Sequence, residues 1–243
     1  MRILTFSKRC AKEILRDPIT LIFGLGFPIV LLLLLSAMQA NIPVELFMIE
    51  NLAPGIAVFG LSFMTLFSAT LVAKDRESSF LERLYTTPLR PCDFILGYML
   101  PLIPISLVQS TACYLVALAL GLSPSVNILS ALAFMLPISS LYVSLGLFIG
   151  SIAGVKAVGG ICGGLFTNLS AWLSGAWFDL TLVGGVFETV AELLPFVHAV
   201  ELERAVIRGD GTAVLPHLFV VVGYAIAVTV LAVLTFLRQM KKR

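Results

Sequence analysis

Long apolar runs alternate with short polar segments along nearly the whole chain. A helix needs about 20 mostly apolar residues to cross the hydrocarbon core of a bilayer, and six of the runs have that length. They occupy residues 18–38, 54–73, 94–120, 128–149, 157–177 and 215–237. We therefore expect an all-α integral membrane fold in which residues 1–243 form one transmembrane domain.

The composition supports the same fold class. The chain is 59% hydrophobic and 12% charged, and its mean hydropathy is +1.03. Soluble domains are about 25% charged, so the composition excludes a soluble enzyme or a nucleic-acid-binding module. The four cysteines show neither metal-ligand nor redox spacing, which favours small packed side chains. They are Cys10, Cys92, Cys113 and Cys162.

Two segments are apolar without having the pattern of a span. Residues 1–17 carry five basic side chains, and their apolar positions recur with helical period, which predicts an amphipathic helix in the membrane interface. We do not expect this segment to be a cleaved signal peptide, because it is too charged before the first apolar run. Residues 178–213 predict two short helices separated near Pro195, dipping into the outer leaflet or capping the bundle.

The polar segment 74–93 carries eight charges, four of each sign, between two apolar runs. Ser79 and Glu82 have the spacing of a capping box, which predicts a short helix. Pro88 disfavours helix at the residue before it, so the helix should end there. We expect a stiffly tied helix through which a soluble partner pushes on the membrane part. The alternative is a merely solvated connecting loop.

The distribution of charge predicts the topology. If both termini, the 74–93 segment and the turn at Lys156 lie on one side, that side holds 14 of the 16 Lys and Arg. By the positive-inside rule this side is cytoplasmic. A six-span protein of the plasma membrane with both ends inside satisfies the rule.

The sequence lacks the motifs expected for ATP hydrolysis, zinc binding and ion-coupled transport. It contains no Gly-Lys dipeptide, hence no Walker A site for ATP hydrolysis. His198 and His217 are the only histidines, which gives a zinc site little support, and we expect no metal and no catalytic residue. The expected spans hold no charged residue away from their ends, unlike most ion-coupled carriers. We therefore expect a pathway for a bulky amphiphile that is powered from elsewhere.

Residues 74–100 resemble the most recognisable segment of the ABC type 2 permeases. Arg76-Glu77, Glu82-Arg83-Leu84, Thr86-Thr87-Pro88 and Gly97 match that pattern, whereas Ser78-Ser79 replace its usual Gly-Thr. The segment around Pro195 is similar to the family's extracellular stretch, and the basic N-terminal helix is similar to its elbow helix.

The resemblance implies six transmembrane helices with an interfacial elbow helix, a cytoplasmic coupling helix and short extracellular re-entrant helices before the last span. The coupling helix would dock on a separate ATP-binding subunit, where ATP and Mg bind, so this chain itself would bind no cofactor. A second permease copy, identical or related, would complete the membrane part, with lipid around it and no nucleic acid. The docking residues carried over are Glu77, Phe80, Leu81, Glu82, Arg83 and Leu84.

A pathway can be proposed only from side-chain type and helical position. Phe59, Phe63 and Phe67 recur every four residues and so form one stripe. If the family arrangement holds, this stripe would face the dimer axis together with four other side chains, although each could equally be a packing or lipid-facing residue. The four others are Thr65, Phe166, Asn168 and Trp172.

Three functions follow from these patterns. The first is an exporter permease for drugs, antibiotic-like peptides or other amphiphiles. The second is an exporter permease for a lipid-linked glycan or a lipid. The third, a non-transporting membrane sensor or assembly subunit, predicts no ATPase partner.

Overall fold

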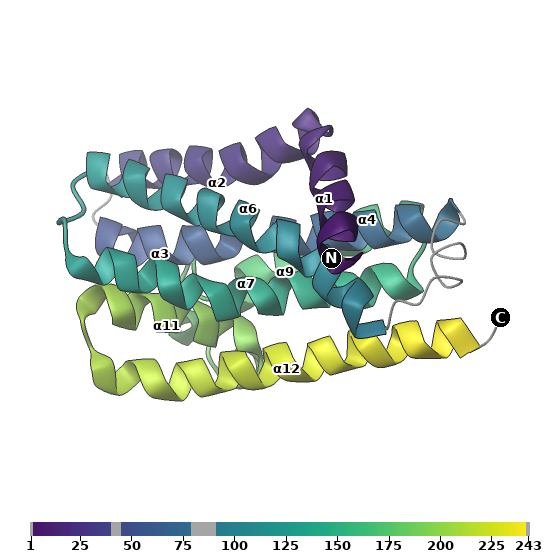
Figure 1. The fold of residues 1–243 in the computed structure, drawn as a ribbon. Helices are drawn as coiled ribbons and strands as arrows, with labels where there is room; N and C mark the ends of the chain where they lie inside the picture. The colour runs from purple at the N-terminus through teal and green to yellow at the C-terminus, as the bar shows by residue number, and fades with distance from the viewer. Residues whose placement is uncertain (1, 40–44, 79–90, 242–243) are drawn as a thin grey trace.

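The computed structural model describes residues 2–39, 45–78 and 91–241, and within them it is almost entirely helical. Long helices run roughly alongside one another, and one short N-terminal helix crosses them steeply (Figure 1). The helices are α1 (Arg2–Leu15), α2 (Pro18–Gln39), α3 (Ile49–Gly60), α4 (Ser62–Glu77), α6 (Pro91–Ala119), α7 (Val126–Ile152), α8 (Val155–Val158), α9 (Thr167–Leu173), α10 (Gly185–Leu193), α11 (Pro195–Arg208) and α12 (Gly211–Lys241). Two 3₁₀ turns, η1 (Glu45–Phe47) and η3 (Leu180–Leu182), and a π-helical segment, η2 (Gly159–Phe166), complete the described part.

The two ends of the bundle differ in which helix termini lie there. The end named inner here, after the expected topology, holds the ends of α4, α7 and α12 and the starts of α2 and α6 (Figure 1). The opposite end, named outer, holds the starts of α3, α7 and α12; α11 packs against these three helices, and α10 packs against α11. Pro195 is the first residue of α11, where its missing N–H costs nothing. This confirms the expected split of the 178–213 segment into two short helices.

Five stretches of helix among the described residues are long and apolar enough to cross a membrane. They are Leu21–Gln39, Ile49–Glu77, Cys92–Ala119, Val126–Ile152 and Gly211–Gln239. The second is broken at Leu61, where α3 passes into α4, and it begins five residues before the expected span. A multi-pass, all-α membrane fold is therefore confirmed at this level.

The expected fifth span, residues 157–177, is not one continuous helix. The chain there forms α8, the π-helical η2 and α9, and helix ends at Leu173. Four glycines fall in eight residues of η2, and glycine weakens the regular α-helical ladder. The count of six spans accordingly stays a prediction.

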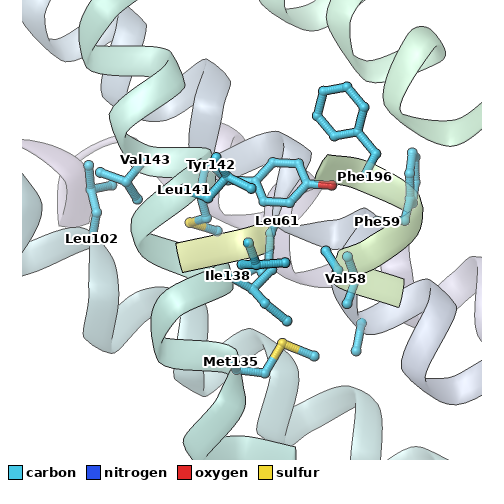
Figure 2. Close-up of a cluster of buried hydrophobic side chains, with 14 of the residues drawn as sticks. Val58, Phe59, Leu61, Leu102, Met135, Ile138, Leu141, Tyr142, Val143 and Phe196 are labelled. Atoms are coloured by element: carbon cyan, nitrogen blue, oxygen red, sulfur yellow. The ribbon is translucent and has the colours of Figure 1, made fainter. Parts of the chain in front are cut away.

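The core lies between α3, α4, α6, α7 and α11. Tyr142 of α7 points its ring toward Phe196 of α11, and the two ring centroids lie 6.0 Å apart (Figure 2). Gly146 and Gly150 of α7 face α4 so closely that a side chain at either position would overlap the α4 backbone. Small residues permit such close approach of helices in membranes. The α4–α7 pair therefore forms a tightly packed unit.

Candidate functional site at the inner end of α4

Asp75, in the last turn of α4, joins three helices. Arg9 of α1 donates to both of its carboxylate oxygens, with N–O distances of 2.6 and 2.5 Å. The hydroxyl of Tyr98 in α6 donates to Oδ2 at 2.8 Å. Asp75 is 1% exposed, so this fork-shaped ion pair is largely removed from water on its acidic side.

The next two residues bind two further segments. The guanidinium of Arg76 donates to the carbonyls of Ser151 and Ala153 at the end of α7, the latter at 2.7 Å. Oε1 of Glu77 accepts a hydrogen bond of 2.8 Å from the amide of Val155, which begins α8. The side-chain amide of Gln239, near the end of α12, donates to the same Ser151 carbonyl. Three consecutive residues thus connect α4 to α1, α6, α7 and α8.

The local physics explains why these side chains take partners outside α4. The C-terminal end of a helix carries partial negative charge, so acidic side chains are unfavourable there. Asp75 and Glu77 lie in the last turn of α4. Arg9 stabilises the Asp75 carboxylate, and the backbone amide of Val155 stabilises the Glu77 carboxylate. An acidic pair in the last turn of an apolar helix was the sequence signal for these contacts, although it did not identify the partners.

Two side chains of α1 at this site, Arg9 and Cys10, have raised pKa values. The hydrogen bonds with Asp75 raise the pKa of Arg9 above its usual value, so it remains charged. Burial, together with the Asp75 charge, raises the pKa of the neighbouring Cys10 thiol to about 12. Cys10 is 0% exposed, and Phe6 packs edge-on against Tyr98 with ring centroids 4.8 Å apart. The inward face of α1 is therefore fixed by charge and by packing.

Of the expected docking residues, the structure describes only Glu77, which is turned toward the start of α8. The expected short helix and the other five docking residues lie outside the described residues. They are Phe80, Leu81, Glu82, Arg83 and Leu84.

The phenylalanines expected to line a pathway do form one stripe, and it faces α2. The rings of Phe59 and Phe63 meet edge-on with centroids 6.2 Å apart, and Phe27 of α2 lies 5.6 Å from Phe63. Phe67 is 5% exposed and packs so closely on Gly24 of α2 that a side chain there would overlap it. Within one chain these rings are packing residues.

The other four pathway candidates do not line one surface together with the stripe of Phe59, Phe63 and Phe67. Thr65 is fully buried and donates to the carbonyl of Tyr142 at 2.8 Å. Phe166 packs edge-on against Phe196, with ring centroids 5.5 Å apart. Asn168 and Trp172 of α9 are exposed, and the Asn168 amide donates to the carbonyl of Gly164 at 2.7 Å. Only these last two present side chains to an open face of the described part.

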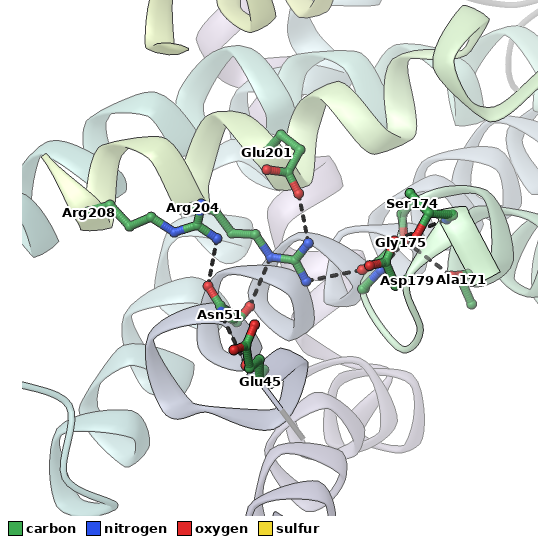
Figure 3. A network of polar contacts seen from close by, with 11 residues as sticks. Glu45, Asn51, Ala171, Ser174, Gly175, Asp179, Glu201, Arg204 and Arg208 are labelled. Atoms are coloured by element: carbon green, nitrogen blue, oxygen red, sulfur yellow. Dashed lines mark hydrogen bonds and ion pairs between the residues drawn. The ribbon is translucent and has the colours of Figure 1, made fainter. Parts of the chain in front are cut away.

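The outer end holds a second polar network that the sequence did not indicate. Arg204 of α11 is 5% exposed and donates to the carbonyls of Asn51 and Gly175, at 3.1 and 3.0 Å, and to Glu201 at 2.8 Å (Figure 3). Arg208 donates to the side chain of Asn51 at 2.7 Å. The network fixes α11 to the start of α3 and to the turn after α9. A cavity of about 340 Å³ lies beside it.

Nδ1 of His198 lies 2.9 Å from Nδ1 of His217, which is 19 positions further along the chain. Nε2 of His198 donates to the carbonyl of Glu192 at 2.8 Å, because a carbonyl can only accept. No group of three or more metal-ligating side chains occurs in the part of the chain that the structure describes.

The chain is similar to several known proteins. It is 27% identical over 208 residues to Nodulation protein J of Sinorhizobium fredii, covering 84% of this chain and 76% of that protein. It is 27% identical over 228 residues to Nodulation protein J of Bradyrhizobium diazoefficiens, covering 93% and 85%. It is 30% identical over 170 residues to ABC transporter G family member 20 of Dictyostelium discoideum, covering 67% of this chain but 23% of that protein.

A family model described as ABC-2 type transporter matches residues 1–207. The match spans the amphipathic helix, the α4 site and most of α11, and it agrees with the all-helical, multi-pass fold. The chain therefore belongs to the ABC-2 type transporter family, whose permeases are the membrane subunits of ABC exporters.

Proposed function

We propose that this chain is the permease of an ATP-driven exporter that moves amphiphiles, such as drugs or antibiotic-like peptides, out of the cytoplasm or the inner leaflet. A separate ATP-binding subunit would dock on residues 74–93, and two permeases, identical or related, would form the membrane part. The family membership supports the role of membrane subunit in an ABC exporter. The contacts at the end of α4 support the proposal that ATP-driven motion reaches the membrane helices through this end.

The observation that carries the route is the set of contacts made by the last turn of α4, which precedes residues 79–90 in the sequence. The last described helical turn before that segment is the one bonded to α1, α6, α7 and α8. A force applied just after Ser78 would therefore act on several helices together. The given sequence contains no Walker A motif, and the proposal assigns ATP hydrolysis to a separate ATP-binding subunit.

The proposed orientation puts the inner end of the bundle, and both termini, in the cytoplasm of a plasma membrane. The excess of Lys and Arg at that end supports it. In the described part, the charged residues of the five long helices lie near helix ends, so these helices place no charged side chain at membrane depth. This favours transport driven by ATP.

A second candidate substrate is a lipid-linked glycan, and the outer cavity favours it. Its lining is rich in side chains that hydrogen-bond hydroxyl groups, namely carboxylates, an amide and guanidiniums. Glu188 and Glu192 are among these carboxylates. A sensor or assembly subunit, the third candidate, would need no ATPase.

Co-expression with an ATP-binding protein encoded by a neighbouring reading frame tests the proposal. We expect a stable complex after purification and vanadate-sensitive ATP hydrolysis in proteoliposomes. Uptake into inverted vesicles of a fluorescent amphiphilic dye, compared with a labelled lipid-linked oligosaccharide, separates the two substrate classes. Absence of any associating ATPase would favour the third candidate.

A further inference from the structure

The exposed side of α1 carries an apolar edge and, next to it, a basic stripe. Leu4 and Leu15 are each 65% exposed, and their separation of about three helical turns places them on the same edge. Lys8, Lys12 and Arg16 recur every four residues on the adjoining face, and all three are exposed. The exposed side of this helix is therefore amphipathic in its own right.

The bundle does not use this apolar edge, because α1 contacts α6 through a different face. Phe6 is buried and packs edge-on against Phe94 and Tyr98 of α6, with ring centroids 6.0 and 4.8 Å apart. Cys10 and Ile14 continue that buried face at spacings of four residues. The apolar edge thus points away from the protein core, and a helix of this kind buries such an edge among acyl chains.

The basic stripe also keeps its charge, whereas the neighbouring arginine does not. Arg9 is compensated by Asp75, at 2.5 and 2.6 Å, and by Glu13, at 2.9 Å. Within the described part of the chain, Lys8, Lys12 and Arg16 form no ion pair. The stripe accordingly presents three positive charges to whatever lies beside the apolar edge.

An open groove of about 730 Å³ runs along the stripe. Ligand pockets commonly have volumes of about 300–1,000 Å³. The described residues that line the groove all belong to α1, and they are Thr5, Lys8, Arg9, Lys12, Glu13 and Arg16. Successive members of the stripe begin about 6 Å apart along the helix. A phosphate group can therefore contact two of these cations at once, as a point charge for lysine and as a two-pronged acceptor for arginine.

We propose that this groove binds the phosphate of an anionic phospholipid, whose acyl chains lie along Leu4 and Leu15. Lys8, Lys12 and Arg16 contact the headgroup. The basic stripe and the apolar edge match the two parts of such a lipid, whereas a free anion would use only the stripe. In the proposed orientation the lipid belongs to the inner leaflet, whose surface is negative. The inference holds whatever substrate the permease exports.

Lipid binding to the purified full-length permease tests this site. Native mass spectrometry in detergent counts the bound lipids during titration with dioleoylphosphatidylglycerol or dioleoylphosphatidylcholine, which share their acyl chains and differ only in the headgroup. Each basic residue near a lipid surface strengthens binding about fivefold, so we expect the parent to prefer phosphatidylglycerol about a hundredfold. Raising the ammonium acetate concentration should reduce this preference, because the stripe is exposed.

Charge-matched variants separate the stripe from the general charge of the inner end. Lys8→Gln combined with Lys12→Gln should weaken phosphatidylglycerol binding about thirtyfold and leave phosphatidylcholine binding unchanged. Lys156→Gln combined with Arg238→Gln removes two exposed charges from other helices at the same end, and it should behave like the parent.

Three results would overturn the inference. One is equal affinity of the parent for the two lipids, and another is a control variant that weakens phosphatidylglycerol binding as much as the stripe variant does. The third is displacement of phosphatidylglycerol by an equal concentration of inorganic phosphate, which would indicate a site for the free anion. None of these measurements depends on an ATPase or on transport, so their failure is distinct from a failure of the proposed function.

Discussion

Arg9 and Asp75 lie 66 positions apart in the chain and share two hydrogen bonds of 2.5 and 2.6 Å. The pair ties the amphipathic helix at the N-terminus to the helix that leads into the polar segment 79–90. The same helical end holds the end of α7 through Arg76. The inner end of α4 is thus one of the places where segments of the bundle are joined by specific polar contacts.

Replacing Arg204 should destabilise the outer end of the bundle. Arg204→Ala would leave two carbonyls and Glu201 without their donor in a nearly closed site, at a cost of about 3 kcal/mol. Arg208→Ala is the matched control, because Arg208 is exposed and its hydrogen bond to the Asn51 side chain lies at the surface, so its loss should change stability little. Thermal unfolding in detergent measures both. Equal stability of the two variants would show that the Arg204 network does not hold α11.

Glu203 of α11 should make the stability of the protein depend on pH. Its carboxyl is fully buried, and burial raises the pKa to about 8, only partly opposed by the hydrogen bond of 2.7 Å from Tyr114. Its other oxygen, Oε1, has no partner in the described part. Because the folded pKa lies above the unfolded value, this contribution to stability is complete below about pH 4.5 and is lost progressively up to about pH 8.

Glu203→Gln keeps the shape and the acceptor for Tyr114 but cannot ionise. We expect it to match the parent near pH 5 and to exceed it at pH 8, by an amount on the order of a few kcal/mol. Unfolding midpoints measured at both pH values check this. A parent whose stability does not fall between them would contradict the buried, protonated state.

Thiol labelling from outside the cell should establish the orientation. Leu182 is a suitable labelling site, since it is 81% exposed in the turn before α10. In a background without Cys92, an impermeant maleimide should reach Leu182→Cys in intact cells and Ser78→Cys only after permeabilisation. The reverse pattern would invert the proposed topology.

The sequence predicted those features that depend on local pattern. Apolar run length located the long helices, and Pro195 located the boundary between α10 and α11. The spacing of Phe59, Phe63 and Phe67 predicted one stripe, which the structure confirms. It did not predict that the stripe packs on α2, because the partner of a helix face is a property of the assembled bundle.

Other features depend on contacts between distant residues, and the sequence could not supply them. Asp75 and Arg9 were visible as charges, but their pairing requires α1 to cross the inner end of α4. The expected span 157–177 contains a π-helical segment, η2, which apolar run length alone did not predict. The docking residues from Phe80 to Leu84 lie outside the described part and remain a prediction.

The central claim is that energy enters through the 74–93 segment from a separate ATPase. Its most direct test is ATP hydrolysis by the co-purified complex, comparing the parent with Glu82→Ala and Leu84→Asp. We predict vanadate-sensitive hydrolysis and transport by the parent, and loss of both in the two variants, with permease abundance and membrane insertion unchanged. Normal hydrolysis and transport by both variants would contradict the claim.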